Sequence, residues 1–423
     1  MESEHIVLQL SVRWIEMKYC TNKILDYTQI QMNSILFKFD YRTSSEHFTR
    51  TSPLDFKTTS LLILNMIKQS IKVELMNGIY EIEETKAVPT RQAFTEAREK
   101  ISYLAFKDFF DKTCELASES EDAREYKGYR IFAVDGTSFV VGKMEKLKSY
   151  FGETTAVEEK AMCRISGIVD VLNDCIINAE VSPFSVGERA LAIEQIKELK
   201  SVKNALYLFD RGYWSPELIK SVIRNKQKFL MRLASNVKKT SITDDNGNEQ
   251  KLRRYSFILP NGNEEILVTN ITEDEMSNEE LADLYTKRWG IETKYLELKD
   301  RLQINKFSGE SCNIVLQDIF CTLYFSNFVA FLCWEADEKI IEKIKNKNNI
   351  YFQKANRTIC IAVLRNRFIK LCLIDDPEKR LVMINRLYED ISNCVTYIGK
   401  SKTKPRRKSG FRSSLNGNVK SIL

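Results

Sequence analysis

The middle of the chain opens with an apolar run that ends in an acid, Arg130-Ile131-Phe132-Ala133-Val134-Asp135. A second run of the same kind follows further on, Ala205-Leu206-Tyr207-Leu208-Phe209-Asp210. Short runs of this composition predict strands that are buried on both faces of a sheet. In open α/β sheets, sites form beyond the carboxyl ends of strands, so Asp135 and Asp210 are candidates to meet there. An acid directly after a strand is also a common turn or capping residue.

The surrounding pattern predicts a mixed α/β domain. Between and after the two runs, we expect a hairpin, two helices and a further strand, at Ile165–Val171 with Cys175–Val181, Glu188–Leu199, from Pro216, and at Phe229–Leu233. Strands that alternate with helices in this way are typical of a mixed sheet with helical layers. Residues 236–271 are polar and carry two Asn-Gly turn signals, which predicts a small β-meander inserted into the domain.

Both flanks of this domain are predicted to be helical. A helix opens at Thr90, after Pro89, and apolar residues then recur at helical spacing as far as Phe109. Residues 340–397 have helical character and lead into a basic segment. The predicted domains are therefore a helical N-terminal domain at 1–125, an α/β domain at 126–335 and a helical C-terminal region at 336–423, with a basic tail from 398.

Composition excludes several classes of function. The 423 residues include just two histidines, His5 and His47, so nucleophile systems and zinc sites that need histidine cannot be built from the bulk of the chain. The ten cysteines contain no C-x-x-C pair and predict reduced, mostly buried thiols in a cytoplasmic protein. The most apolar stretch, Ile314–Trp334, is interrupted by polar residues, and we expect no membrane span.

The net charge of +6 comes from one end of the chain. Residues 398–423 hold eight Lys and Arg and no acid. Taking these eight from the total of 64 leaves 56, against 58 Asp and Glu, so the rest of the chain is slightly acidic. A dense cationic arm predicts binding to a phosphate backbone, and a solubilising tail is the alternative.

A predicted helix over Leu281–Leu302 carries a mixed set of functional side chains. Its apolar residues define one buried stripe: Leu284, Ile291, Tyr295, Leu298 and Leu302. Tyr285, Arg288, Glu292 and Lys299 recur at spacings of three, four and seven, which places them along the border of that stripe. The other charges, Asp283, Lys287, Lys294 and Glu297, are expected on the opposite, solvent-facing side.

Together, Asp135, Asp210 and Glu292 predict a carboxylate metal site. Oxygen ligands without histidine suit hard divalent ions such as Mg²⁺ or Mn²⁺. Two such ions can activate an attacking oxygen and stabilise the leaving oxygen of a phosphodiester. Tyr285, Arg288 and Lys299, beside the acid, would then hold phosphates.

These residues resemble a known family. The pattern Tyr285-x2-Arg288-x3-Glu292-x6-Lys299 is similar to the Y-R-E-K signature of the DDE transposases of bacterial insertion sequences, in the IS-four group. Val134-Asp135-Gly136-Thr137 and Phe209-Asp210-Arg211-Gly212-Tyr213 resemble the two aspartate motifs of that family. The helix at Thr90–Phe94, the run Arg288–Glu292 and the basic tail also look like family features.

The resemblance implies a fold and an activity. It implies an RNase H-like catalytic domain with a β-rich insertion between the second Asp and the Glu. It also implies metal-dependent cleavage at transposon ends, strand transfer of the 3′-hydroxyl into target double-stranded DNA, and a homodimer in a paired-end complex. By position, Asp135, Asp210 and Glu292 would be catalytic and bind two Mg²⁺ or Mn²⁺ ions, whereas Tyr285, Arg288 and Lys299 would contact DNA.

One departure from the family concerns the insertion. Some members stack a flipped base on a tryptophan there, but residues 236–271 contain Tyr255 and Phe257 and no tryptophan. Either Tyr255, Phe257 or Trp214 takes the place of that tryptophan in a hairpin mechanism, or the base-flipping step differs. Trp214 and Trp289 are otherwise expected to be packing residues. Two other functions stay open: a domesticated DNA-binding protein that no longer cuts, and an RNase H-like nuclease without end specificity.

Overall fold

The computed structural model describes residues 20–65, 68–154, 160–237, 240–243, 249–258, 262–345 and 352–398. The basic residues of the predicted tail and the Asn246-Gly247 turn lie outside the described residues. The described chain divides into two compact units, residues 1–330 and 331–423. The predicted domain limit at 335 falls inside a continuous helix, α12 (Cys312–Ile344). The three predicted domain ranges remain predictions.

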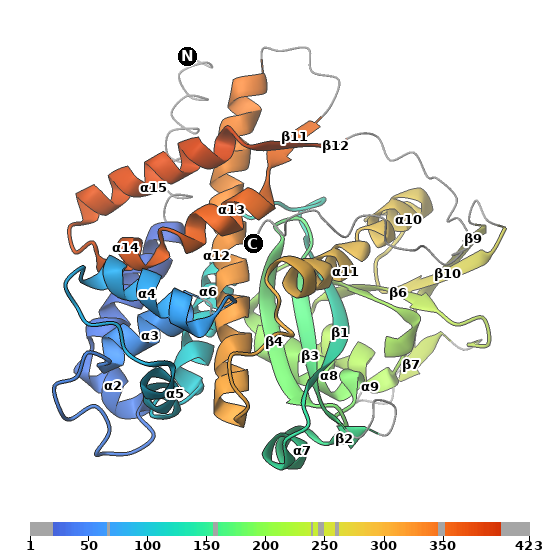
Figure 1. The fold of residues 1–423 in the computed structure, drawn as a ribbon. Helices are drawn as coiled ribbons and strands as arrows, with labels where there is room; N and C mark the ends of the chain where they lie inside the picture. Colours follow the sequence, from blue (N-terminus) through green and yellow to red (C-terminus); the bar gives the residue numbers. More distant parts are fainter. Residues whose placement is uncertain are drawn as a thin grey trace, which may run out of the picture. The chain divides into compact units, whose positions relative to one another are not determined.

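Most of the described strands of the first unit form one mixed main sheet, which lies beside helix α12 (Figure 1). Its first five long strands are β1 (Arg130–Gly142), β3 (Lys160–Asp170), β4 (Cys175–Pro183), β5 (Ala205–Phe209) and β6 (Lys228–Leu233). They lie in the spatial order β4-β3-β1-β5-β6, with β3 antiparallel to both neighbours and β1, β5 and β6 parallel. This arrangement of a three-stranded antiparallel meander followed by parallel strands confirms the predicted mixed α/β, RNase H-like fold.

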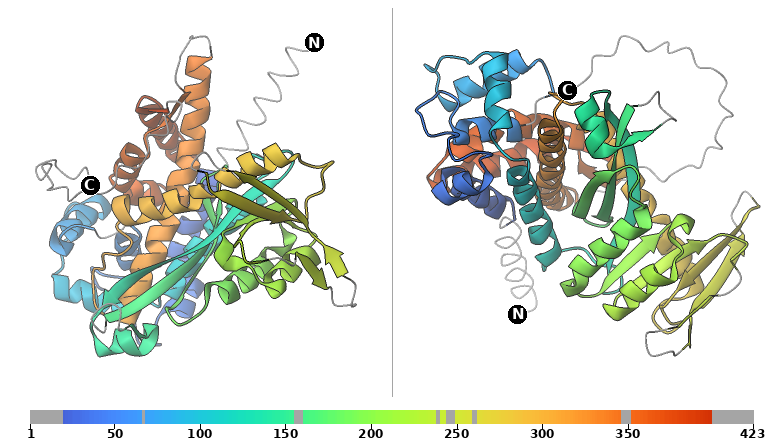
Figure 2. Two further views of the ribbon diagram at one scale, coloured as in Figure 1. Left: turned by 90° about the vertical axis from the view of Figure 1, so that its right-hand side faces the viewer. Right: turned by 90° about the horizontal axis from the view of Figure 1, so that it is seen from below.

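Helices cover both faces of this sheet. Gly136 and Ser166 are directly paired, so they share a face, and that face meets α8 (Glu188–Glu198) at Glu188 and Gln195. Their chain neighbours Asp135 and Gly167 point to the other face, which meets Tyr295 of α11 (Trp289–Leu296). Figure 2 shows α8 and α9 (Pro216–Arg224) on one side of the sheet and α10 (Asn278–Thr286) with α11 on the other.

The described residues of the predicted insertion form four strands, and two of these extend the main sheet. β10 (Glu264–Thr269) pairs antiparallel with β6, and β9 (Arg253–Ile258) pairs with β10 at the sheet edge. Among the described strands of this insertion, β7 (Ser241–Thr243) and β8 (Glu249–Lys251) are the two that leave the main sheet and form a separate ribbon. The meander is thus partly continuous with the core sheet, because Ile266 and Val268 continue the buried apolar pattern of β6.

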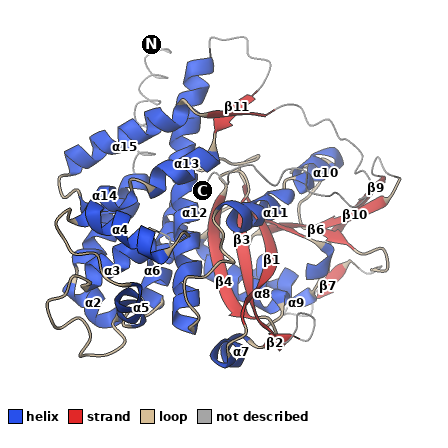
Figure 3. Ribbon diagram, viewed as in Figure 1, coloured by secondary structure: helices blue, strands red, loops and turns tan. Residues whose placement is uncertain are grey.

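The chain before β1 is helical, as predicted (Figure 3). Its elements are a helix over 20–33, α2 (Ile35–Tyr41), α3 (Phe56–Leu64), α4 (Ile71–Ile82), α5 (Arg91–Glu99) and α6 (Leu104–Glu119). Thr90 caps α5 by accepting from the Ala93 N–H. The single helix predicted from Thr90 to Phe109 is wrong, because the chain breaks at Lys100 and Ile101 bridges to Arg42.

Helix α12 is a core element of the first unit up to Ala330. It is long and apolar enough to cross a membrane, but its most apolar window is wholly buried within the protein. Its polar residues are matched inside the core: Arg98 of α5 donates to Gln317 at 3.0 Å and to Asp318 at 2.8 Å. Asn327 accepts from the Ile176 N–H at 2.8 Å. Such internal partners are the signature of a core helix.

The second unit, residues 331–423, is mainly helical in its described part. It contains the end of α12 followed by α13 (Arg357–Arg365), α14 (Phe368–Leu373) and α15 (Pro377–Ser392). Two short strands, β11 (Phe352–Ala355) and β12 (Val395–Ile398), pair antiparallel and bring the two ends of this helical segment together.

Candidate active site

The two predicted aspartates lie side by side at the edge of the parallel strands. Val134 of β1 is in register with Phe209, the last residue of β5. Adjacent strands are about 4.8 Å apart, so Asp135 and Asp210, one residue further on, are neighbours. β1 does not end at Asp135 as the apolar run suggested, because it continues to Gly142 as the antiparallel partner of β3. Asp135 therefore stands where the parallel pairing of β1 stops.

Two buried tyrosines dock the helices that carry the third acid. The Tyr285 hydroxyl donates to the backbone carbonyl of Phe209 at 3.2 Å, directly before Asp210. The Tyr295 hydroxyl donates to the backbone carbonyl of Asp135 at 2.7 Å. A Cβ on Gly167 would lie 2.7 Å from the Tyr295 hydroxyl, so the phenol fits because residue 167 has no side chain. Each tyrosine thus ties its helix to the backbone of one predicted catalytic strand.

Arg288 lies among all three predicted metal-binding acids. Its guanidinium donates to Glu292 at 2.8 Å, and its charge also acts on Asp135 and Asp210. The Arg288 side chain is 8% exposed. Burial opposes its charge, but Tyr285, Glu292 and Asp210 outweigh this effect, so the pKa of Arg288 is raised. Arg288 is the internal counter-ion of the acidic site.

The carboxyl group of Asp135 has a pKa well above its ordinary value. Burial raises the pKa of Asp135 to about 6, and Glu188 and Glu292 add to the increase. The Gly136 N–H, which donates to Oδ1 at 2.9 Å, and the Arg288 charge act in the opposite direction. A buried carboxyl surrounded by other carboxylates favours a cation as its partner.

Comparison with known proteins identifies the domain that holds these residues. Residues 126–325 match the family described as "Transposase DDE domain". The protein contains a DDE transposase domain. This finding confirms the family resemblance that the aspartate and Tyr-Arg-Glu-Lys motifs predicted, although it leaves the IS-four group as a prediction.

Two curated relatives carry the same kind of name. The chain is 26% identical over 156 residues to "Putative transposase for insertion sequence element IS4SA" of Synechocystis sp. and 24% identical over 134 residues to "Putative transposase InsZ" of Escherichia coli. These matches cover 34% and 30% of this chain. The chain spans less than half the length of each relative, 46% and 44%.

A solved structure also resembles the chain. It is described as piggyBac transposase in a synaptic complex with hairpin DNA, and it covers 87% of this chain and 84% of its own at 12% identity and a TM-score of 0.46. The assignment of the DDE domain rests instead on the matched residues and on the strand order seen here.

The helix that carries the Tyr-Arg-Glu-Lys residues differs from the predicted one. It ends at Thr286, resumes at Trp289 as α11, and finishes as a π-helical turn, η4 (Glu297–Arg301). The expected buried stripe is confirmed, since Leu284, Ile291, Tyr295, Leu298 and Leu302 are all buried. Lys299 lies half-buried in the π-helical turn, and the described residues provide it with no hydrogen-bond or ion-pair partner.

Two charges expected in solvent are buried instead. Lys294 is 1% exposed and bonds Asp174 at 2.8 Å and Glu297 at 3.2 Å. This triad fastens α11 to the turn between β3 and β4.

Trp289, which we expected to pack, is 57% exposed beside Arg288, with the guanidinium 5.4 Å from its ring. Burial of Trp289 was therefore a wrong prediction.

Sequence reasoning did not point to two further residues that lie close to Asp135. Glu188 was interpreted as a first-turn acid of α8, yet a Cβ on Gly136 would lie 2.7 Å from its carboxyl carbon. Tyr213, in the turn η3 (Arg211–Tyr213) after Asp210, is 3% exposed, and its hydroxyl has no hydrogen-bond partner among the described residues. The available signal was the glycine that directly follows Asp135, since close approach to backbone requires glycine.

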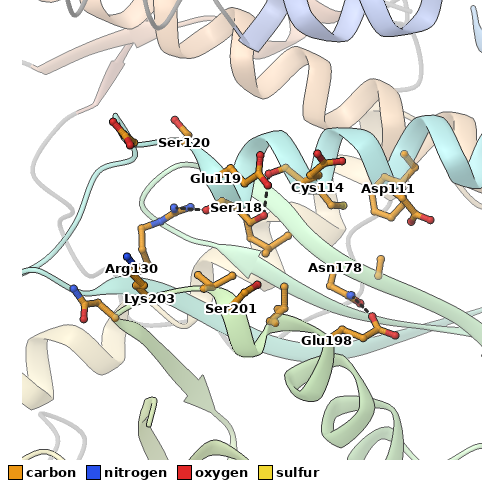
Figure 4. A pocket seen from close by; sticks show the side chains of 18 of the residues that line it. Asp111, Cys114, Ser118, Glu119, Ser120, Arg130, Asn178, Glu198, Ser201 and Lys203 are labelled. Carbon is orange, nitrogen blue, oxygen red and sulfur yellow. Dashed lines mark hydrogen bonds between the residues drawn. The ribbon is translucent and has the colours of Figure 1, made fainter. Parts of the chain in front are cut away.

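A cavity beside the main sheet lies away from these acids. It has a volume of about 890 Å³ and is bounded by α6, β4 and the segment before β5 (Figure 4). Arg130 and Asn204, at the amino ends of β1 and β5, line it, whereas Asp135 and Asp210 are at the opposite ends of those strands. The cavity is therefore separate from the candidate active site.

The donor set fits a divalent metal by its chemistry. DDE transposases as a family use divalent ions, and the acids here offer oxygen ligands that suit Mg²⁺. Among the described residues, no three potential ligands are already close enough to hold a metal ion. Glu292 is instead paired with Arg288. For Glu292 to act as a metal ligand, its carboxylate would therefore have to turn from Arg288 toward the aspartates.

Proposed function

We propose that this protein is a DNA transposase of a bacterial insertion sequence, in the Y-R-E-K group, that cleaves DNA at transposon ends and transfers the 3′-hydroxyl strand into target DNA. One observation carries the proposal. Asp135 and Asp210, which directly follow the paired residues Val134 and Phe209, share the Arg288 counter-ion with Glu292, inside a DDE transposase domain. An arrangement of three acids around one cation fits a site that cleaves and joins phosphodiester bonds.

Asp135, Asp210 and Glu292 would hold the metal ions in this reaction. Two bound Mg²⁺ or Mn²⁺ ions would activate the attacking oxygen and stabilise the leaving oxygen. The protein's own contribution is positioning, because Tyr295 and Tyr285 fix the backbone next to each aspartate. Asp135 must lose its proton to act, and Arg288 favours that ionised form.

Tyr285, Arg288 and Lys299 would contact the phosphates of the transposon end. Arg288 has a planar fork of donors that can exchange the Glu292 carboxylate for a phosphate. Lys299 lies seven residues after Glu292, which is about two turns further along the chain, and it has no hydrogen-bond or ion-pair partner within the described structure. The Tyr285 phenol is engaged with Phe209, so its contribution to DNA binding would come through the ring edge or after a local shift.

The proposed partners follow from the reaction. The protein would bind double-stranded DNA at terminal inverted repeats and at the target, as a homodimer that pairs the two ends, in the bacterial cytoplasm at the nucleoid. The basic residues after 398, predicted from the sequence, would add contacts to the phosphate backbone.

Cleavage of matched terminal DNA tests the proposal. The substrate is the DNA that flanks the gene, where short inverted repeats are expected. Asp135→Asn, Asp210→Asn and Glu292→Gln are each expected to abolish Mg²⁺-dependent cleavage and to leave DNA binding largely intact. Asp283→Asn, an exposed acid on α10, is the matched control and should cleave normally. Full cleavage by any of the three site variants would refute the assignment.

The same assay separates the two alternatives. A domesticated DNA-binding protein would bind the ends without cutting them, even in its wild-type form. A nuclease without end specificity would cut scrambled DNA as well as the terminal repeat. The complete set of acids argues against the first alternative, because a site freed from cleavage has no need of carboxylates buried beside one another.

A further inference from the structure

We propose that Glu188 is a fourth carboxylate of the metal site, and this inference rests on the proposed function. Its position is the first observation. Gly136 follows Asp135 in β1, and a Cβ there would lie 2.7 Å from both the carboxyl carbon and Oε1 of Glu188. The carboxylate therefore lies against the β1 backbone at the residue next to Asp135. The negative charge of Glu188 also acts on the Asp135 carboxyl group.

Glu188 is held in this position by the neighbouring strand. Arg164 of β3 lies 3.4 Å from Oε1 of Glu188 through Nε, and its Nη1 donates to the Val186 carbonyl just before α8. Helix α8 is in turn fixed to β3, because Gln195 accepts from the Ser166 hydroxyl at 2.7 Å and donates to the Ser166 carbonyl at 3.0 Å. The carboxylate is thus supported by a chain of polar contacts, which is how metal ligands are oriented.

The interaction of an acid with its own helix does not explain this arrangement. Acids in the first turn stabilise a helix through its dipole, and often by accepting from the free N–H groups. Helix α8 has Gly187 as its N-cap and no side-chain capping hydrogen bond. Glu188 turns instead toward β1, where Gly136 leaves room for it.

A second, independent observation points to an absent ligand at the same place. Tyr213 is 3% exposed, and its hydroxyl has no hydrogen-bond partner within the described part of the chain. Burial raises the pKa of this phenol, and the charges of Asp135 and Glu188 are the next contributors. A buried hydroxyl without a partner is costly, so one beside two carboxylates indicates a group that is bound between them.

The fourth carboxylate has a defined task in the proposed reaction. Asp135 and Glu188 approach from the two faces of the sheet, so they can bracket an ion at the β1 edge while Arg288 keeps Glu292. Four acids also explain how the site can hold two divalent charges next to a buried guanidinium. Glu188 would therefore contribute to ion binding before the Arg288–Glu292 pair opens.

Direct titration of Mn²⁺ tests the inference without relying on cleavage. The full chain is titrated with Mn²⁺ and the free ion is followed by electron paramagnetic resonance. We expect Glu188→Gln to raise the Mn²⁺ dissociation constant roughly 10-fold or more, in line with the effect of disturbing a metal site. Gln keeps the size of the side chain and a contact to Arg164. Glu194→Gln, an exposed acid on the same helix, should leave the constant unchanged.

A glycine variant provides a second route to the same conclusion. In Gly136→Ala, the new methyl group would displace the flexible end of the Glu188 side chain. In this variant the affinity for Mn²⁺ should fall, whereas the melting temperature should change little. The double variant Gly136→Ala/Glu188→Gln should bind Mn²⁺ no more weakly than Glu188→Gln alone. Additive losses in the double variant would contradict a shared cause.

The Asp135→Asn protein separates failure of the inference from failure of the proposed function. Loss of Mn²⁺ binding in both Asp135→Asn and Glu188→Gln supports the inference. A loss in Asp135→Asn with Glu188→Gln within twofold of wild type overturns the role of Glu188 and leaves the proposed function standing. Unchanged binding in Asp135→Asn removes the metal site from the proposed function, and the inference falls with it.

Discussion

The Tyr295 hydroxyl donates a hydrogen bond to the backbone carbonyl of Asp135 across 160 residues of sequence. The phenol reaches this carbonyl because Gly167, the partner of Asp135 in β3, has no side chain to block it. Since Glu292 is one helical turn before Tyr295, this bond sets the distance between the third acid and the first. One contact therefore couples the helix packing to the geometry of the site.

Removal of this hydroxyl should affect both stability and turnover. In Tyr295→Phe, the buried carbonyl of Asp135 loses its partner, and we expect a destabilisation of about 1–2 kcal/mol. Because Glu292 is then less well placed, the rate of end cleavage should fall more than the affinity for DNA. Urea unfolding and single-turnover cleavage measure the two effects. Tyr80→Phe, at a half-exposed position on α4, is the control, and equal behaviour of the two variants would contradict the proposed coupling.

Much of the fold could be predicted because the core strands are strongly patterned. The apolar runs before Asp135 and Asp210 form adjacent parallel strands, and the Asn173-Asp174 turn forms the predicted hairpin with Asp174 in the left-handed region. Local sequence patterns predict the ends of helices and strands less well than their presence. β1 continues past Asp135 because β3 offers it a pairing partner, which is a tertiary effect.

The candidate site was predicted in part. Spacing alone placed Tyr285, Arg288 and Glu292 on one border of a helix, and the structure places Arg288 among the acids. Glu188 and Tyr213 were missed because nothing in their local sequence distinguishes them from capping and packing residues. Lys294 was misplaced because the π-helical turn and its partner Asp174, distant in sequence, draw it into the interior.

The pKa of Asp135 predicts a pH dependence of stability. Its folded-state value of about 6 exceeds the ordinary value of 3.8, so the folded state binds the proton more tightly than the unfolded state. The resulting stabilisation is fully present below pH 3.8 and is lost as the pH rises through 6. Without metal, Asp135→Asn should therefore gain stability over wild type between pH 4 and pH 7, by up to about 3 kcal/mol.

Urea unfolding of both proteins at several pH values checks this difference. The difference in the free energy of unfolding between the two proteins cancels the titration of groups that do not contact Asp135. The charged groups that face Asp135 are present in both proteins: Glu188, Glu292, Asp210 and Arg288. Addition of Mg²⁺ at pH 7 should reverse the order, since the wild type alone keeps the full set of ligands. A stability difference that does not change from pH 4 to pH 7 would show that Asp135 is not buried as described.

The buried Lys294 triad predicts a large structural effect away from the acids. Lys294→Met keeps the aliphatic stem but leaves Glu297, which is 8% exposed, without its nearest cation. Breaking a buried pair in this way should cost about 3–5 kcal/mol. The double change Lys294→Met/Glu297→Leu should recover much of that loss. Urea denaturation measures both variants, with the exposed Lys287→Met as control, and a double variant as unstable as the single one would exclude a charge effect.

The basic tail predicts the salt dependence of DNA binding. Residues 398–423 carry eight cations, and each phosphate that one of them neutralises adds about 0.9 to the slope of log K against log salt concentration. A chain that ends at Tyr397 should therefore bind terminal DNA with a slope reduced by as much as about 7, and its affinity should fall most at low salt. Cleavage at saturating protein should persist, because the acids of the site lie in the first unit.

Filter binding across a salt series measures the slope. A chain of full length with the tail cations changed to Gln is the matched control, because it separates loss of charge from loss of length. An unchanged slope would mean that the tail keeps the protein in solution and does not bind the DNA backbone.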